Sequence, residues 1–367
     1  MFDLAQKYGD AINLSVGEPD FPTPSHIIDA AVEAMKAGFT HYTPNAGLME
    51  FREAVAEKLK KENGIEVEPS KEVIATVGAM GALSLAILST VNPGDEVLIP
   101  NPGFVSYEAQ VLLAGGKPVY YPTIEEGKFV VNLVKLEQSI SKKTKAIIIN
   151  SPSNPTGAML DIQQLERIAE IAVENDLLII SDEAYESIIY DDAKHISIAS
   201  LPEMKERTIS IFTFSKTYAM TGWRIGFAAA NESIISHMTK LQEHLYAHPS
   251  SISQKAAVAA LRGPKVSIEM MVREYSERRG LVLKMLGGIL GIKYSKPQGA
   301  FYVFPSISAF KKSSMDFAMS ILEKAKVIIV PGTAFGSNGE GYMRISYATS
   351  REKLVEALSR IKAAIAH

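Results

Sequence analysis

Short, almost continuously apolar runs recur up to about residue 230, and longer segments with helical periodicity separate them. Such runs, rich in β-branched residues, are typical of strands buried on both faces of a sheet. In the segments between them apolar residues return every three or four positions, as in a helix with one buried face. We predict strands at Glu72–Val77, Glu96–Ile99, Lys117–Tyr121, Ala146–Ile149, Leu177–Ile180 and Thr208–Phe212, and helices at Leu48–Glu62, Ala79–Thr90, Val105–Ala114 and Ile162–Asn175.

This alternation of strands and helices predicts an α/β fold, with a mostly parallel sheet flanked by helices on both faces. The pattern then changes to two long helical stretches, Ser233–Leu261 and Ser267–Leu290, followed by a shorter α+β set. We therefore expect a large domain over 38–268 and a smaller α+β domain formed by 1–37 plus 269–367. The elements expected in the tail are Ala300–Phe304, Met315–Lys326, Val327–Val330, Tyr342–Tyr347 and Ser350–Ile365.

Composition narrows the classes of function. The 367 residues carry a net charge of -3, so no strong field of one sign would attract nucleic acid or an anionic membrane. There is no cysteine, which excludes disulfides and thiolate chemistry. The N-terminus lacks the pattern of a secretory signal, and no apolar run approaches the roughly 20 residues that span a membrane. We expect a cytoplasmic protein with no nucleic-acid or membrane partner. Only His244 and His248 have a metal-ligand spacing, and with no acidic motif beside them we expect no metal.

Candidate chemistry follows the predicted strands, because ligands of open α/β sheets bind outside the carboxyl ends of the strands. Four strand ends lead into GAMGAL from Gly78, NSPSNPTG from Asn150, SDEAY from Ser181 and TFSKTYAMTGWRIG from Thr213. Together they bring an Asn, an Asp, a Tyr, a Lys and an Arg to one edge of the sheet. The glycine-rich turn opens a helix whose free N–H groups favour an anion, although a tight turn would also select small residues.

Each candidate also has a structural interpretation. Asp182 is suited to a metal, a general base or a cationic ring nitrogen, but it is equally typical of a helix cap. Lys216 lies among hydroxyl residues near Arg224, a setting that suits a phosphate and lowers the pKa of a lysine, whereas most lysines are solvated charges. Asn154-Pro155 predicts a turn, and a cis bond is compatible with it. Arg344 interrupts an apolar strand, so it either binds a substrate carboxylate or forms a structural salt bridge.

Taken together, these motifs resemble the class I, fold type I aminotransferases that depend on pyridoxal 5′-phosphate, and in particular the aspartate and aromatic-amino-acid branch. The similarity covers nearly the whole chain, in order and with family-like spacing. It implies a sheet of the seven-stranded type and a homodimer with shared active sites. The matching segments are LSVGEPDFPTP (Leu14–Pro24), HYTPNAGLMEFREAVA (His41–Ala56), TVGAMGAL (Thr76–Leu83), PNPGFVSY (Pro100–Tyr107), NSPSNPTGA (Asn150–Ala158), SDEAYE (Ser181–Glu186), FTFSKTYAMTGWRIGF (Phe212–Phe227), KPQGAFYVFP (Lys296–Pro305) and VPGTAFG…GYMRISYA (Val330–Ala348).

The resemblance implies three catalytic residues. Lys216 matches the lysine that forms the Schiff base with the cofactor, and Asp182 matches the carboxylate that pairs with the pyridine nitrogen. Tyr185 matches a hydrogen-bond partner of the cofactor's phenolic oxygen. The other implied contacts are Asn154 to the same oxygen, Phe104 stacking on the ring, Gly78, Ala79, Met80, Ser215 and Arg224 to the phosphate, Tyr42 to the phosphate from the neighbouring subunit, and Gly17, Asn154 and Arg344 to the substrate.

The implied reaction moves the amino group of an L-amino acid to a 2-oxo acid, 2-oxoglutarate in our interpretation, by a ping-pong mechanism. Two rivals are a C–S β-lyase, which would share the cofactor residues, and an effector-binding domain of a transcriptional regulator, which would need a preceding DNA-binding segment. Met80 stands where some aspartate-specific relatives have Lys or a hydroxyl residue, and Leu245–Ser253 contains no Arg. With Phe104, Tyr107 and Tyr246 as aromatic neighbours, we expect aromatic or large apolar donors to rival aspartate.

Overall fold

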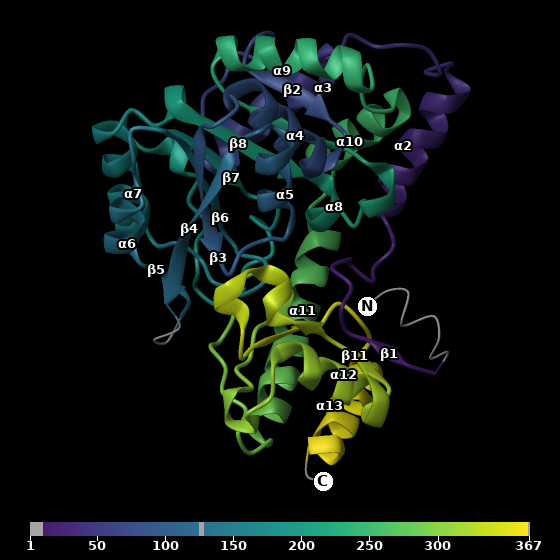
Figure 1. Ribbon diagram of the computed structural model, residues 1–367. Coiled ribbons are helices and arrows are strands. Elements are labelled where there is room, and N and C mark those ends of the chain that lie inside the picture. The colour runs from purple at the N-terminus through teal and green to yellow at the C-terminus, as the bar shows by residue number, and fades with distance from the viewer. Residues whose placement is uncertain (1–9, 125–127, 366–367) are drawn as a thin grey trace.

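The computed structural model describes residues 10–124 and 128–365, arranged as an upper and a lower lobe joined by helix α11, Val266–Gly287 (Figure 1). The upper lobe is built on one sheet with the strand order β2-β9-β8-β7-β6-β3-β4-β5. The four pairings between β8, β7, β6, β3 and β4 are parallel, and the pairings at both ends of the sheet are antiparallel. Its strands are β2 (Val73–Thr76), β3 (Glu96–Asn101), β4 (Lys117–Ile124), β5 (Val130–Val131), β6 (Thr144–Asn150), β7 (Leu178–Asp182), β8 (Thr208–Thr213) and β9 (Gly226–Ala229).

The expected α/β class and mostly parallel sheet are confirmed, and all six strands predicted for this sheet are present. Two further strands were not predicted. β9 is a short antiparallel strand inside the TFSKTYAMTGWRIGF segment, and β5 has only two residues. A sheet of the seven-stranded type therefore gains β5 as an eighth strand at its edge.

Helices cover both faces of the sheet, and the side chains of each strand alternate between them. Ile148 packs with α4, α5 and α9, whereas its neighbours Ile147 and Ile149 pack with α6 and α7. This alternation with period two is what a strand buried on both faces requires. The helices of the upper lobe are α2 (Ser25–Lys36), α3 (Met49–Lys58), α4 (Gly78–Thr90), α5 (Ser106–Leu113), α6 (Leu133–Gln138), α7 (Ile162–Glu174), α8 (Phe214–Thr217), α9 (Glu232–Leu245) and α10 (Ser251–Arg262).

Two helix predictions differ from the structure. The stretch expected as one helix over Ser233–Leu261 is divided into α9 and α10, and Ala247 between them has a left-handed φ of 62°. Pro249 follows there and cannot continue a helix, so the sequence did contain the signal for a break. The helix predicted over Leu48–Glu62 ends as α3 at Lys58 and continues as a short π-helical turn, Leu59–Asn63.

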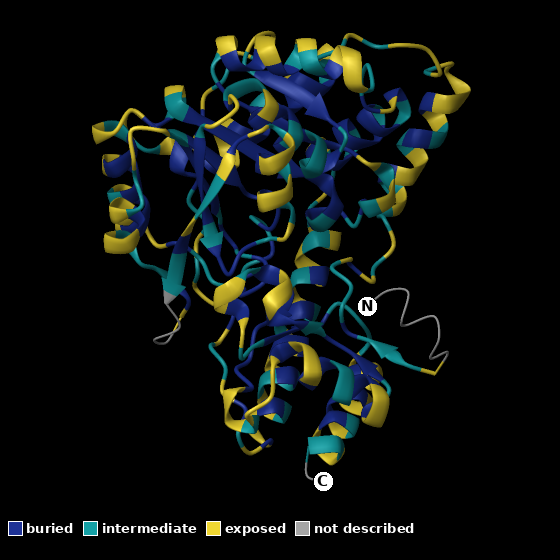
Figure 2. Cartoon of the chain, in the orientation of Figure 1, coloured by how far each residue is buried: buried dark blue, intermediate teal, exposed yellow. Residues whose placement is uncertain are grey.

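The lower lobe holds its own apolar core, to which the tail of the chain contributes most residues. Two short sheets lie there: β10 (Tyr302–Val303), β13 (Met343–Ser346) and β12 (Val330–Pro331) form one, and β1 (Ile12–Asn13) pairs with β11 (Val327–Ile328) in the other. Helices α12 (Ser314–Ala325) and α13 (Arg351–Ile365) pack beside them. Buried residues concentrate in the sheet and in this second core (Figure 2).

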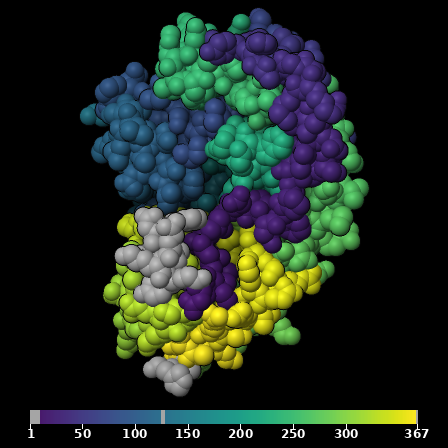
Figure 3. Space-filling view, turned by 90° about the vertical axis from the view of Figure 1, so that its right-hand side faces the viewer, coloured from purple at the N-terminus to yellow at the C-terminus, as the bar shows by residue number. Residues whose placement is uncertain are grey.

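The N-terminal segment passes from one lobe to the other, and in the space-filling view it runs down one side of the molecule between them (Figure 3). Its strand β1 pairs in the lower lobe, but Ile27 and Ala31 of helix α2 belong to the core around α3 and α10. The division of the chain into domains at residues 37 and 268 stays a prediction, and residues 1–9 lie outside the described residues. Within the described ranges, no helix combines the length and apolarity needed to cross a membrane.

Candidate active site

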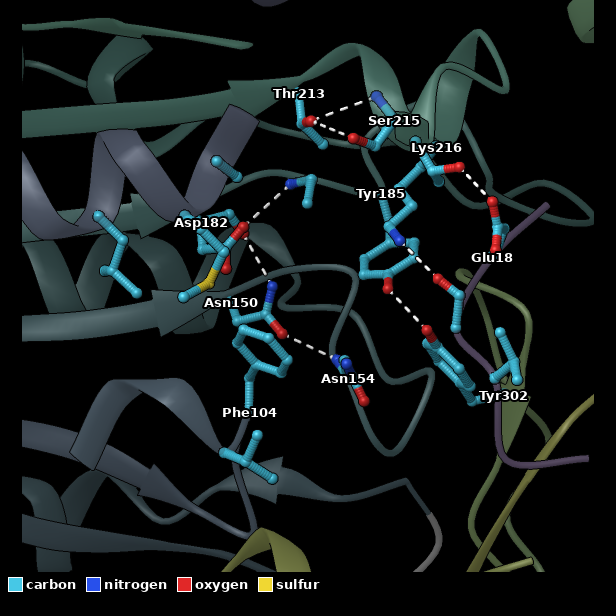
Figure 4. Close-up of a pocket in the computed structure, with 18 of the residues that line it drawn as sticks. Glu18, Phe104, Asn150, Asn154, Asp182, Tyr185, Thr213, Ser215, Lys216 and Tyr302 are labelled. Atoms are coloured by element: carbon cyan, nitrogen blue, oxygen red, sulfur yellow. Dashed lines mark hydrogen bonds between the residues drawn. The ribbon is translucent and has the colours of Figure 1, made fainter. Parts of the chain in front are cut away.

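One cavity of about 580 Å³ lies at the carboxyl ends of the sheet strands, between the two lobes (Figure 4). This volume falls in the range of small-molecule sites. Both lobes supply its walls, because Arg344 and Tyr302 come from β13 and β10 while Asp182 comes from β7. The lining residues are Val16, Gly17, Glu18, Ala79, Met80, Leu83, Phe104, Val105, Asn150, Asn154, Asp182, Ala184, Tyr185, Thr213, Ser215, Lys216, Thr221, Arg224, Tyr302, Val330, Phe335 and Arg344.

Asp182 is the last residue of β7 and is buried in the wall of the cavity. Its Oδ2 accepts a hydrogen bond of 2.7 Å from the hydroxyl of Tyr107, and its Oδ1 accepts one of 3.2 Å from the backbone N–H of Ala184. Its backbone carbonyl accepts a hydrogen bond from the Asn150 amide at 2.9 Å. Burial raises the pKa of Asp182, and the hydrogen bonds from Tyr107 and Ala184 partly counter that effect.

Lys216 lies in α8, a single helical turn that follows β8 directly. Its ammonium group donates a hydrogen bond of 2.6 Å to the carbonyl oxygen of Gly17 and lies 5.8 Å from the centre of the Tyr185 ring. Burial lowers the pKa of Lys216 to about 8, and the charges of Arg344 and Arg224 act in the same direction. A lysine of this kind has a substantial neutral fraction near neutral pH, which a nucleophilic amine requires.

Tyr185 is buried at the cavity wall, where its hydroxyl lies 2.8 Å from the hydroxyl of Tyr302 (Figure 4). We did not predict Tyr302 as a site residue, because its place in the apolar segment Ala300–Phe304 is typical of an ordinary core position. Asn154 follows β6, in a turn where Ser151-Pro152 and Asn154-Pro155 are both cis. Phe104 precedes α5 and presents its ring to the cavity.

A group of hydrogen-bond donors and one cation surrounds the amino end of α4. Gly78 begins this helix with a left-handed φ of 67°, and a Cβ placed there would lie 3.0 Å from Nη2 of Arg224. Thr213 and Ser215 face the same end of the cavity, with their hydroxyl oxygens 2.9 Å apart. Arg224 donates a hydrogen bond to the Thr221 carbonyl at 2.8 Å and forms no salt bridge with any described residue. Helix N–H groups beside an unpaired guanidinium form a site for an anion.

Arg344 is buried on β13, and its guanidinium lies between two aromatic rings, 4.4 Å from the centre of Tyr302 and 4.8 Å from that of Phe335. It donates hydrogen bonds to Asn154 Oδ1 at 2.8 Å and to the carbonyl of Ser15 at 2.6 Å. No carboxylate of the described chain pairs with it, and its buried Nε has no partner. Of the two interpretations of Arg344, the structural salt bridge is therefore wrong within the described residues, and an anion site is left.

Of the site residues predicted from the sequence, Gly17, Ala79, Met80, Phe104, Asn154, Asp182, Tyr185, Ser215, Lys216, Arg224 and Arg344 all line this cavity. Gly78 lies directly behind Arg224. Tyr42 is not part of the lining: its side chain is 89% exposed and its ring packs edge-on to His248 at 5.6 Å.

Two aromatic residues expected to widen the substrate pocket lie elsewhere. Tyr107 is buried behind Phe104, with its hydroxyl on Asp182. Tyr246 does not line the cavity, and its buried hydroxyl lies close to Gly81. The motif PNPGFVSY placed Tyr107 near Phe104 but did not show on which side of Phe104 it would lie.

Behind the cavity, the next residue after Asp182 belongs to a separate buried polar network. Glu183 accepts hydrogen bonds from Ser181 and Ser197 and lies 2.7 Å from Nε2 of His195. Lys58 pairs with Glu186 in the same network. Glu183, Glu186 and His195 come close enough together to hold a metal, a cluster that their spacing in the sequence did not reveal. Because their charges are already paired within the protein, the geometry gives no reason to assign an ion, and the absence of a metal stays a prediction.

Comparisons with known proteins identify the family of the chain. Residues 9–361 match the family model described as aminotransferase class I and II. The chain is 52% identical to an aspartate aminotransferase of Pyrococcus abyssi and 50% identical to aromatic-amino-acid aminotransferase 2 of Thermococcus litoralis, covering 99% of this chain and 93% of the relative in each case. The crystal structure of an aromatic aminotransferase from Pyrococcus horikoshii superposes with a TM-score of 0.95 at 50% identity, covering 98% of both chains. The resemblance inferred from the sequence is confirmed, and the chain belongs to the class I and II aminotransferase family.

Proposed function

We propose that this aminotransferase uses pyridoxal 5′-phosphate, held by Lys216, to move the amino group of an L-amino acid to 2-oxoglutarate. The observation that carries the proposal is a buried lysine with a pKa of about 8 in a cavity that also contains Asp182 and two arginines that form no salt bridge with any described residue. These groups suit an aldehyde, a ring nitrogen and two anions. A phosphorylated pyridine aldehyde and an amino-acid carboxylate together present all four.

The cavity fits the proposed cofactor at three points. Phe104 offers a face for the ring, Asp182 offers a buried carboxylate for the ring nitrogen, and the amino end of α4 with Arg224 offers an anion site for the phosphate. Tyr185 carries a hydroxyl that can donate to the phenolic oxygen. When bound, the pyridine ring supplies an electron sink for the electrons released at the amino acid's Cα.

The protein's own part in the reaction is to orient the substrate and to move protons. Arg344 and the backbone of Gly17 bind and orient the α-carboxylate, and Asn154 fixes the guanidinium of Arg344. The neutral amine of Lys216 would act as the base that takes the proton from Cα of the substrate and, once protonated, as the acid that gives it back. Asp182, ionised, holds a proton on the ring nitrogen. The apolar walls at Leu83 and Phe335 exclude water from the reacting atoms.

The charges of the cavity bear on the choice of donor. Among the described lining residues the only cations are Lys216, Arg224 and Arg344, and each already has a role in the proposal. Glu18 adds an anion to the lining, so a second substrate carboxylate would have no spare cation from this chain. Met80, Leu83, Phe104 and Val105 instead offer apolar surface. We infer that aromatic or large apolar donors rival aspartate, while 2-oxoglutarate places its second carboxylate on neutral donors or waters.

We also propose that the enzyme is a homodimer and that Tyr42 serves the cavity of the partner subunit. The support is its exposure: a tyrosine that is 89% exposed and lies outside its own cavity is free to reach another chain. Subunits with Lys216→Ala can be mixed with subunits that carry a Tyr42 variant of greatly reduced activity, under conditions that let dimers exchange. Some mixed dimers then hold one site with both lesions and one intact site, so activity rises above that of either parent. If exchange is demonstrated and activity does not rise, Tyr42 does not act across the interface.

Steady-state kinetics test the proposed reaction. Aspartate, phenylalanine, tyrosine and alanine are each assayed as donors with 2-oxoglutarate, following formation of glutamate and the new oxo acid. We expect amino transfer that requires the oxo acid, with phenylalanine or tyrosine at least matching aspartate in kcat/KM. Ammonia release without an oxo acid would instead indicate a lyase. A lead of aspartate over phenylalanine of about a hundredfold, or about 2.7 kcal/mol in barrier height, would refute the argument from Met80 and the missing cation.

A further inference from the structure

The carboxylate of Asp182 depends on very few donors. One of its oxygens receives the Tyr107 hydroxyl at 2.7 Å, and the other receives only the longer contact from the Ala184 N–H at 3.2 Å. No cation of the described chain forms a salt bridge with it, although the side chain is buried. A buried carboxylate that lacks a salt bridge depends strongly on the hydrogen bonds it accepts to keep its charge, and for Asp182 the bond from Tyr107 lowers the pKa most, ahead of the Ala184 N–H and the charge of Lys216.

Tyr107 is placed to serve Asp182 rather than the substrate. It lies in the first turn of α5, three residues after Phe104, and only 1% of it is exposed. The rings of Phe104 and Tyr107 meet edge to face, with centres 5.6 Å apart and planes at 79°. Phe104 lines the cavity whereas Tyr107 does not. One turn of chain thus supplies a face for a ring and, behind it, a hydroxyl for the carboxylate.

The Tyr107 hydroxyl also remains protonated, so it is always able to donate a hydrogen bond. Burial, with the neighbouring charge of Asp182, raises the pKa of Tyr107 well above its usual value, so its proton stays in place over the whole working range of pH. The same hydrogen bond lowers the pKa of Asp182 against the effect of burial. Ionised aspartate and neutral tyrosine therefore stabilise each other.

We propose that Tyr107 is a positioning residue that keeps Asp182 ionised and aimed at the ring nitrogen of the cofactor. This inference rests on the proposed function, since it concerns how the chain would hold a protonated pyridine ring. The alternative is that Tyr107 has only a packing role behind Phe104. Tyr107→Phe separates the two, because phenylalanine keeps the ring and its packing but removes the hydroxyl.

The test measures binding rather than turnover. Protein freed of cofactor by dialysis is titrated calorimetrically with pyridoxal 5′-phosphate and with its 1-deaza analogue, in which carbon replaces the ring nitrogen. Losing a hydrogen bond to a charged group weakens an interaction on the order of 10- to 100-fold. We expect Tyr107→Phe to weaken the binding of pyridoxal phosphate by about that factor and to leave the affinity for the analogue unchanged. In an Asp182→Asn background, the same substitution should have little further effect on either ligand.

Tyr121→Phe is the matched control, since Tyr121 is equally buried but donates its hydroxyl to the Ile148 carbonyl at 2.7 Å. It should change neither affinity. The positioning role would be overturned if Tyr107→Phe lost the same amount of affinity for both ligands, or lost no affinity for either. If the wild-type protein itself fails to bind pyridoxal phosphate, the proposed function fails instead.

Tyr107→His, which restores an N–H donor at the same turn, provides a second variant. Tyr107→His should bind pyridoxal phosphate in preference to the analogue more strongly than Tyr107→Phe does. If its preference is not greater, the result counts against the proposal.

Discussion

Asp182 and Glu183 are consecutive buried carboxylates that enter opposite surroundings. Asp182 faces the cavity, with two hydrogen bonds and no salt bridge to any described residue. Glu183 points to the other side, where Ser181, Ser197 and His195 all contact it. The alternation of side chains along an extended chain produces this split, so one strand end contributes to two polar regions.

The other charges follow the same division. Behind the strand end, Lys58 is paired with Glu186. In the cavity, Lys216, Arg224 and Arg344 contact carbonyl or amide oxygens but form no salt bridge with the described chain. Buried charges that the protein itself has paired stabilise the fold, whereas cavity charges held only by neutral acceptors are available to a charged ligand. That distinction can be tested with matched variants from the two regions.

The largest difference is expected between the two buried lysines. Lys216→Met keeps the volume but removes the nucleophile, so turnover should fall by several orders of magnitude. Because burial disfavours the lost charge and no described residue forms a salt bridge with it, the dialysed protein should unfold at the same temperature or a higher one. Lys58→Met leaves Glu186 buried without its cation and should cost about 3–5 kcal/mol of stability. Turnover assays and thermal unfolding check both variants, and equal loss of stability in the two would break the comparison.

The two buried arginines should differ in a similar way. Arg344→Gln removes the guanidinium proposed to clamp the substrate carboxylate, and kcat/KM should fall by about 10²–10³-fold, since truncating a buried charged contact costs roughly 2–5 kcal/mol. Arg279 is as deeply buried but pairs with Asp191 at 2.8 Å, far from the cavity lining. Arg279→Gln should lower the unfolding temperature and leave KM unchanged. Substrate saturation curves for both variants decide the matter, and an unchanged kcat/KM in Arg344→Gln would contradict the assignment.

Glu183→Gln tests the network behind the cavity. We expect a loss of about 3 kcal/mol of stability, because His195 would lose the buried partner charge that lies 2.7 Å from its Nε2. Burial lowers the pKa of His195, but the hydrogen bond and charge of Glu183 outweigh it and raise that pKa. A raised folded pKa contributes stability that is complete below the unfolded value of His and is lost as pH rises through the folded value. Chemical unfolding between pH 5 and 9 should therefore show that the difference in free energy of unfolding between Glu183→Gln and wild type becomes smaller as the pH rises.

An exposed pair serves as the control for this variant. Glu33→Gln removes one partner of a surface salt bridge with Lys36 and should change stability by less than about 0.5 kcal/mol. A gap that stays constant with pH would mean that His195 is not the titrating partner of Glu183.

The smallest effect concerns the ionisation of Lys216. Dialysed protein is mixed with pyridoxal phosphate, and the covalent product is trapped with borohydride at a series of pH values. Only the neutral amine attacks an aldehyde, so the initial rate should rise about tenfold per pH unit and level off above about 8, where Lys216 loses its proton. A rate that keeps rising to pH 10 would indicate an ordinary solvated lysine.

Most of the sheet could be predicted because its strands are buried on both faces, which leaves a continuous apolar signature. β9 was missed because Gly226–Ala229 has only four residues, three of them glycine or alanine, so no apolar run stands out. The cavity residues were found because strand ends are punctuated by polar and glycine-rich segments, and the family motifs supplied their roles. Tyr302 was not predicted as a site residue and Tyr107 was expected only as an aromatic neighbour, since the sequence gives no sign of where a tyrosine hydroxyl points. The cluster of Glu183, Glu186 and His195 depends on folding of a loop, which residue spacing does not encode.

The pairing of β1 with β11 determines when the cavity can be completed during synthesis. Gly17 lines the cavity, and the Ser15 carbonyl holds Arg344, only because Leu14 is bonded to Ser346 and Ile12 to Lys326, at the far end of the chain. Contacts between such distant positions form late, since the cost of closing so long a loop must be met first. A growing chain still attached to the ribosome can fold its sheet and present Asp182 and Lys216, but Gly17 has no strand to hold it. The enzyme is therefore unable to process a substrate until translation has delivered β11 and β13.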